Sequence, residues 1–135
     1  MFDVEAQLLE WVANEFGVAW QVEVREGLRR ARAGHAAEVY VARNQEEILG
    51  FAAHGVWGGR LFGPMGAARA ARGTGIGSRL LRECLADQFM AGQERSDIGW
   101  VGPVTFYSKV VGARISRVYR LSSKQIAPGA MRPSG

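Results

Sequence analysis

The residues best suited to chemistry form a glycine-rich stretch, Arg72-Gly73-Thr74-Gly75-Ile76-Gly77-Ser78. Glycine lets the backbone turn sharply and come close to a ligand. The first N–H groups of a following helix have no partners inside that helix, and together with the helix dipole they attract an anion. The stretch therefore predicts a site for a phosphate group.

Three phosphate-loop patterns and one structural explanation compete for this stretch. A nucleotide-binding P-loop needs a lysine after its last glycine, and none follows here. The dinucleotide pattern G-x-G-x-x-G, counted from Gly73, meets Ser78 where its third glycine belongs. Arg72, Gly75 and Gly77 satisfy a third pattern: Gln or Arg, two residues, Gly, one residue, then Gly or Ala. The structural explanation is a turn that only caps a helix, but three glycines in five residues exceed what a cap needs.

Strands are expected to lead into the glycine stretch. Residues 38–43 and 48–54 alternate like strands on either side of a polar turn at 44–46, which predicts an antiparallel hairpin. A third strand is expected over residues 60–67, where Pro64 cannot donate to a ladder. The hairpins argue against the parallel unit that the dinucleotide pattern requires.

Helices are expected on both sides of these strands. Residues 76–89 form the strongest amphipathic helix, which begins directly after the glycine stretch. Residues 20–24 also alternate like a strand, but Trp20, Val24 and Leu28 share a helical face, which favours a helix. The other expected elements are helices over 3–16, 20–33 and 103–111, a short buried strand over 97–100 and a last strand over 117–121.

The whole chain has the size and composition of one globular domain. Of its 135 residues, 47% are hydrophobic and 22% are charged, which excludes a disordered chain. We expect one domain over residues 1–124 and a flexible tail over 125–135. No apolar run is long enough to cross a bilayer and no signal peptide is evident, so a cytoplasmic location is expected.

The small number of cysteines and histidines limits the metal and redox chemistry. Cys84 is the single cysteine, so an internal disulfide is excluded, and with only His35 and His54 beside it we expect no metal site. The helical periodicity places Cys84 on an apolar face, where a small buried side chain is expected. The net charge of +4 allows a polyanionic partner but identifies none.

In this order and spacing, the motifs resemble those of the GNAT family of acetyl-CoA-dependent N-acetyltransferases. The resemblance covers about residues 38–121 and rests on the glycine stretch and on Gly102-Pro103-Val104-Thr105-Phe106-Tyr107-Ser108-Lys109-Val110-Val111-Gly112-Ala113. The latter looks like the late helix of the family, in which a tyrosine is followed shortly by a glycine. The implied fold is of the α/β (α+β) type, with a mixed, mostly antiparallel central sheet flanked by helices.

The chain departs from the family pattern in three places. The family begins with a strand before its first two helices, whereas this chain begins with a helix; that strand is missing, supplied differently, or hidden in residues 20–24. Trp100 stands about where an asparagine often starts the late helix, and the distance from Tyr107 to Gly112 is one residue longer than usual.

The resemblance implies a binding role for three groups of residues. Backbone groups of Met65, Gly66 and Ala67 would pair with the pantetheine arm of acetyl-CoA, as in strand addition, and Pro64 would help to splay the neighbouring strands. The pyrophosphate would lie on backbone N–H groups of the glycine stretch, supplied by Gly73, Thr74, Gly75, Ile76, Gly77 and Ser78, with the charge of Arg72 beside it. Arg79 and Arg82 could also reach a phosphate, although exposed helical arginines are more often simply solvated.

The resemblance also implies the chemistry of the reaction. An amine would attack the thioester directly, a backbone N–H near Met65 and Ala67 would stabilise the oxyanion, and Tyr107 would protonate the departing thiolate. A phenol with a pKa near ~10 keeps its proton at neutral pH, although Tyr107 could instead be a core aromatic. The sequence identifies no general base: His54, Glu38, Asp97 and an ordered water all remain open.

The leading hypothesis is therefore an N-acetyltransferase for a small-molecule or peptide amine, with acetyl-CoA as cosubstrate and no metal. The alternative is a non-catalytic acyl-CoA-binding module, or half of a larger acetyltransferase assembly. A basic nucleic-acid binder ranks last, because no recognition helix with a basic face is evident and the glycine stretch would have no role. A nucleic-acid or membrane partner is not expected; a homodimer that covers an open sheet edge would be compatible with the pattern.

Overall fold

The computed structural model describes residues 3–99, 104–118 and 122–125. The chain divides into two compact units, Met1–Gly102 and Pro103–Gly135, which are described separately. The first unit contains α1 (Val4–Phe16), α2 (Val18–Arg32), β1 (Glu38–Asn44), β2 (Glu47–His54), β3 (Leu61–Ala67), the short 3-10 helix η1 (Arg69–Ala71), α3 (Ile76–Met90) and β4 (Asp97–Ile98). The second contains α4 (Val104–Val111). The prediction of one domain over residues 1–124 with a tail beyond it stays a prediction.

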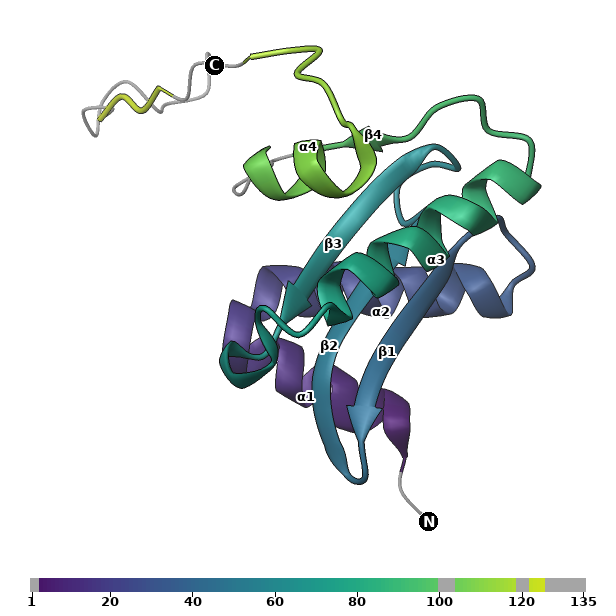
Figure 1. Cartoon of the computed structure of the whole chain (residues 1–135). Helices are drawn as coiled ribbons and strands as arrows, with labels where there is room; N and C mark the ends of the chain where they lie inside the picture. Colours follow the sequence, from purple (N-terminus) through teal and green to yellow (C-terminus); the bar gives the residue numbers. More distant parts are fainter. Residues whose placement is uncertain (1–2, 100–103, 119–121, 126–135) are drawn as a thin grey trace, which may run out of the picture. The chain divides into compact units, whose positions relative to one another are not determined.

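A four-stranded sheet organises the first unit. Its order is β1-β2-β3-β4, with antiparallel pairs between the first three strands and a parallel pair between β3 and β4. Figure 1 shows α1 and α2 on one face of the sheet and α3 on the other. The expected α/β fold with a mixed, mostly antiparallel sheet is confirmed.

The core lies mainly between the sheet and the first two helices. The fully buried ring of Phe51 on β2 packs there with Leu8 and Val12 of α1 and Val24 of α2. Because Val24 enters this core on a helix, residues 20–24 belong to α2, and the alternative that they hide the missing strand is wrong. Periodicity alone had allowed both forms, and packing against the sheet decides between them.

Local signals explain where the first elements begin and end. The Asp3 side chain accepts a hydrogen bond from the Ala6 N–H at 3.2 Å and caps α1. Gly17, at φ +103°, separates α1 from α2 in a conformation that a side chain would disfavour. The expected β1–β2 hairpin is confirmed, with Gln45 at φ +53° in its turn.

Two expected strands differ from the structure. The strand expected over 97–100 is only Asp97–Ile98 and is half-buried rather than buried, because β4 pairs with just two residues of β3. Arg117 and Val118, at the start of the expected last strand, form no strand. Residues 100 and 119–121 lie outside the described part of the chain, as do Pro103 and most of the expected tail. Among the described residues no helix has the length and apolar character needed to span a membrane.

Candidate active site

The glycine stretch forms a tight exposed loop between η1 and α3. Thr74 holds its shape, because its hydroxyl donates to the Ala71 carbonyl and its N–H lies 3.4 Å from the same oxygen. Gly73 and Gly75 have φ values of +80° and +90°, and a Cβ on either would meet nothing within 4 Å. These glycines are therefore required by backbone conformation and not by lack of space.

The loop delivers unpaired N–H groups to the start of α3. Gly75 caps the helix without a side-chain hydrogen bond, and the first helical bond runs from the Arg79 N–H to the Gly75 carbonyl at 3.0 Å. The N–H groups of Ile76, Gly77 and Ser78 therefore have no hydrogen-bond partner within the described residues. Since these half-buried groups lie at the positive end of the helix dipole, they can receive an anion.

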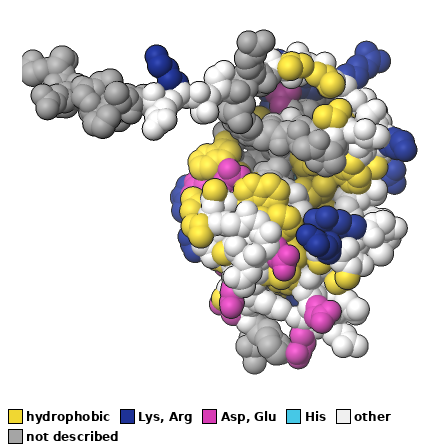
Figure 2. Space-filling view, turned by 90° about the vertical axis from the view of Figure 1, so that its left-hand side faces the viewer, with side chains coloured by type: hydrophobic (Ala, Val, Ile, Leu, Met, Phe, Trp, Pro, Cys, Tyr) yellow, Lys and Arg dark blue, Asp and Glu magenta, His cyan; other side chains and the backbone are white. Residues whose placement is uncertain are grey.

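Basic side chains surround this loop unequally. Arg72 is exposed and forms no ion pair with any described residue, so its guanidinium is free to approach an anion. Arg79 instead pairs with Glu83 one turn along α3, at 2.7 Å, so its guanidinium already has a carboxylate partner. The loop lies on the left-hand side of the molecule in Figure 1, and Figure 2 shows that side facing the viewer. A compact group of Lys and Arg side chains is visible there.

One edge of β3 is open over most of its length. β4 pairs with β3 only at Leu61–Asp97 and Phe62–Ile98. On that side no strand of the described chain covers residues 63–67. Among the described residues the two parallel strands are therefore unpaired beyond Phe62, and the backbone groups on this side of β3 could bond an extended ligand.

The register shows which backbone groups face this open edge. On the β2 side, the Ala68 N–H donates to the Leu49 carbonyl at 2.8 Å. Backbone groups of an antiparallel strand alternate between its two sides. Gly66 therefore points its N–H and C=O toward β2, whereas Met65 and Ala67 point theirs to the open edge. Of the three residues expected to hold an extended ligand, two face outward and Gly66 does not.

Tyr107 lies on α4, in the second unit. Its side chain is 8% exposed and its ring meets that of Phe106 edge-on, with centroids 5.1 Å apart. Burial raises the pKa of the Tyr107 phenol. The hydroxyl therefore keeps its proton at neutral pH and suits a proton donor rather than a base. Its assignment to the reaction stays a prediction.

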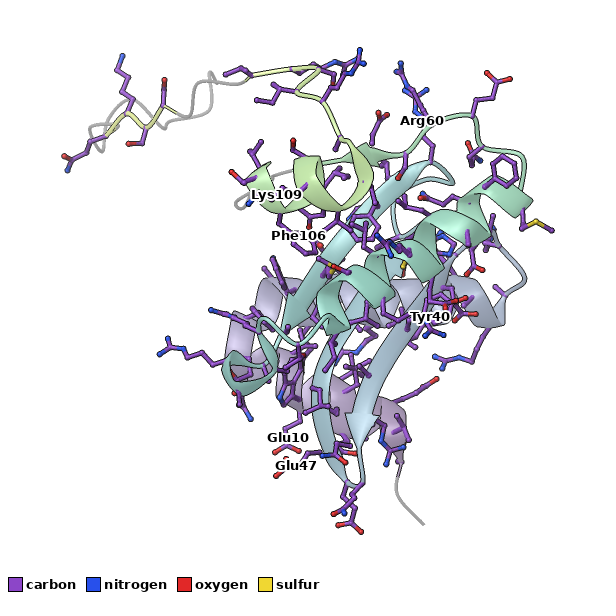
Figure 3. The ribbon with its side chains drawn as sticks, viewed as in Figure 1. Glu10, Tyr40, Glu47, Arg60, Phe106 and Lys109 are labelled. Carbon is purple, nitrogen blue, oxygen red and sulfur yellow. The ribbon has the colours of Figure 1, made fainter. Side chains whose placement is uncertain are left out.

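His54 belongs to a polar cluster beneath α3 that sequence reasoning did not find. His54 is 4% exposed, and its Nε2 lies 3.2 Å from Asp87 Oδ2. Tyr40 of β1, which is labelled in Figure 3, donates to the same oxygen at 2.5 Å. This hydrogen bond, and then burial, raise the pKa of the Tyr40 phenol. The three residues are far apart in sequence, so only their helical and strand phases could have suggested the contact.

This cluster favours a structural role for His54. One ring nitrogen is occupied by Asp87, and the other, Nδ1, is buried without a hydrogen-bond partner among the described residues. The other two candidate bases are also engaged. Glu38 accepts from the Val39 N–H at 3.0 Å, and Asp97 pairs with Arg60 at 2.8 Å.

Cys84 is fully buried on α3, as expected, and burial raises the pKa of its thiol, so it is a poor nucleophile. Among the described residues no group of three His, Cys, Asp or Glu side chains is arranged to hold a metal ion.

The comparison with protein families agrees with the resemblance seen in the sequence. The family described as the acetyltransferase (GNAT) domain matches residues 35–110. This match covers more than half of the chain, from before β1 to near the end of α4. The chain therefore belongs to the GNAT family, and acetyl transfer is its general activity.

Solved structures resemble this chain in fold. An acetyltransferase from Trypanosoma brucei has a TM-score of 0.61 and 18% sequence identity, with 91% of this chain and 96% of that chain covered. An integron cassette protein from the mobile metagenome of V. cholerae has a TM-score of 0.58 and 20% identity, with 90% and 85% covered. At these identities the likeness shows the fold alone. The comparison with curated protein sequences finds no significant match.

Proposed function

We propose that this chain transfers the acetyl group of acetyl-CoA to a primary amine that attacks the thioester directly. One observation carries the proposal: the open edge of β3 runs into the glycine loop without an intervening strand. An extended pantetheine arm needs backbone partners along a strand edge, and a pyrophosphate needs N–H groups at a helix start. The chain supplies both needs in sequence, from Met65 to Ser78.

Different residues bind different parts of acetyl-CoA in this proposal. The outward N–H and C=O groups of Met65 and Ala67 bond the pantetheine arm and, at its end, the thioester. The N–H groups of Ile76, Gly77 and Ser78 bond the pyrophosphate, with Arg72 free to approach it. Gly73, Thr74 and Gly75 contribute by giving the loop its shape.

The proposed reaction requires one acid and no covalent enzyme intermediate. The amine nitrogen forms a bond to the thioester carbonyl carbon, and an outward N–H of β3 stabilises the resulting oxyanion. The carbon–sulfur bond then breaks and the departing thiolate takes up a proton, for which Tyr107 is the acid predicted from the sequence. In this proposal the proton lost by the amine passes to water; His54 is buried against Asp87, and Asp97 pairs with Arg60.

A thermal melt with and without acetyl-CoA tests the binding step, with AMP and NAD as controls. A ligand that binds only the folded protein raises the melting temperature; at 100 times its dissociation constant the gain is about 2.7 kcal/mol, or roughly 10 °C. We expect a clear shift with acetyl-CoA and little with either control. No shift at millimolar acetyl-CoA would refute the proposal. A shift without turnover across a panel of amines would favour the non-catalytic acyl-CoA-binding module.

A further inference from the structure

A side chain from α1 occupies the space beneath the proposed acyl site. A Cβ built on Gly66 of β3 would lie 2.4 Å from Cζ of Phe16, 2.7 Å from Cε2 and 3.0 Å from Cε1. Gly66 has no positive φ, so its backbone does not demand a glycine. Gly66 is therefore glycine because the ring of Phe16 fills the volume that a side chain would need.

The Phe16 ring is held firmly in this position. It stacks on Trp20 with centroids 4.8 Å apart, and it meets Trp11 and Phe51 edge-on at 5.6 and 6.0 Å. Phe51 is fully buried, so the ring is braced against the core. Phe16 itself is only half-buried, so part of its surface remains accessible.

The register places this ring on one defined side of the open edge. Gly66 pairs with Phe51 and faces the helices α1 and α2, whereas Ala67 pairs with Gly50, whose Cβ position lies 3.3 Å from Leu80 of α3. Opposed residues share a face of the sheet. Successive residues alternate faces, so Met65 lies with Ala67 on the α3 side. The ring of Phe16 therefore lies against the backbone of Gly66, the residue between the outward-facing Met65 and Ala67.

We propose that Phe16 limits the length of the acyl group that this protein accepts, so that short acyl groups such as acetyl are selected over longer ones. The inference rests on the proposed function, because it requires the thioester at Met65 and Ala67. If the thioester lies at these two residues, an acyl chain that extends from it toward α1 would meet the ring of Phe16. Well-packed aromatic rings yield poorly to added methylene groups.

The test compares the dissociation constants of acetyl-CoA, propionyl-CoA and butyryl-CoA by calorimetry, which needs no knowledge of the amine. We expect the wild-type protein to bind acetyl-CoA about tenfold or more tightly than butyryl-CoA, within the range that small differences in apolar substrates produce. Phe16→Ala should reduce this ratio to near one. Val12→Ala is the matched control, because it removes buried α1 packing without opening the space at Gly66 and should leave the ratio unchanged.

The outcomes separate the two proposals. If no acyl-CoA binds the wild-type protein, the proposed function itself fails. If all three bind but Phe16→Ala keeps the wild-type ratio, or Met65→Ala on the opposite face changes it instead, only the inference about Phe16 fails.

A double-mutant cycle gives a readout that does not depend on binding. Gly66→Ala should lower the melting temperature of the wild-type protein, and it should lower that of Phe16→Ala much less, because the colliding ring is gone. Equal losses in both backgrounds would show that Phe16 does not occupy the Gly66 space, and would overturn the proposal.

Discussion

At the scale of single residues, the chain separates groups that can take part in chemistry from groups that hold the fold. Met65 and Ala67 present backbone groups to the open edge of β3. The guanidinium of Arg72 is exposed and forms no ion pair with any described residue. His54 was an open candidate base by residue type, whereas Cys84 was expected to be buried; both are buried, Cys84 on α3 and His54 on β2 beneath it. Residue type alone therefore identifies candidates, and burial and partners select among them.

Replacement of Tyr107 by phenylalanine tests the proposed general acid. Tyr107→Phe removes the hydroxyl but keeps the ring and its edge-on contact with Phe106. If Tyr107 protonates the thiolate, kcat should fall by about 10²–10⁴-fold, while the dissociation constant of acetyl-CoA stays within about twofold. Steady-state kinetics and calorimetry measure the two quantities. An unchanged kcat would assign the proton to another group and leave Tyr107 as a packing residue.

The Tyr40–Asp87 hydrogen bond predicts a specific dependence of stability on pH. Because the pKa of Tyr40 is raised in the folded protein, the bond contributes fully below the unfolded-state pKa of about 10 and is lost as the pH rises through the folded value. The wild-type protein should therefore melt higher than Tyr40→Phe at pH 7, and the difference should shrink above about pH 10. Melting temperatures across pH 7–11 measure it. A difference that stays constant over that range would mean that the hydroxyl is not the stabilising group.

At the scale of elements, the loop before α3 depends on glycine for its conformation. Gly75 at φ +90° and Gly34 at φ +85° both have open space where a Cβ would lie. They differ in position, since Gly75 caps α3 inside the proposed phosphate site whereas Gly34 follows α2. Substitutions at Gly75 and Gly34 should therefore cause similar backbone strain, and only the one at Gly75 should affect a ligand of the loop.

Gly75→Ala and Gly34→Ala are expected to have similar costs in stability and different effects on binding. Each places a side chain in a left-handed conformation, at a cost of roughly 1–2 kcal/mol in the free energy of unfolding. Only Gly75→Ala should weaken the binding of acetyl-CoA, because it disturbs the N–H groups of Ile76 and Gly77. Urea unfolding and calorimetry on both variants measure this. Equal acetyl-CoA affinities in the two variants would show that the loop is only a helix cap.

At the scale of the whole molecule, stability is concentrated between the sheet and the first two helices. Phe51 joins β2 to an aromatic cluster formed by Trp11, Phe16 and Trp20. This cluster lies directly behind β3, so the packing that stabilises the first unit also supports the strand that would hold the cosubstrate. Stability and function are therefore coupled through one layer of side chains.

Two identical substitutions compare the core with the surface. Phe51 is fully buried, whereas Phe89 near the end of α3 is 75% exposed. Phe51→Ala should cost about 3–5 kcal/mol, a large share of the 5–15 kcal/mol typical of a domain, and Phe89→Ala about 0.5 kcal/mol or less. Urea denaturation provides both values. A large loss for Phe89→Ala would show that its ring is covered in solution.

Much of this architecture was predictable from local patterns, for identifiable reasons. The α1, α2 and α3 helices, the β1–β2 hairpin and the glycine loop carry short-range signals: apolar periodicity, capping residues and glycines at positive φ. The short β4 and the absence of a strand at Arg117 and Val118 were not predictable in this way. Strand formation there depends on partners elsewhere in the chain, which an alternating pattern does not specify.

The amino-acid sequence was sufficient for the fold class, the family and the loop that suits a phosphate, because each of these depends on residues close together in the chain. Only the tertiary structure could show that Met65 and Ala67 face an open edge, that Gly66 faces Phe16, and that His54 is paired with Asp87. These facts depend on strand register and on contacts across the sheet. Register and packing are set by the folded chain as a whole, so no local pattern contains them.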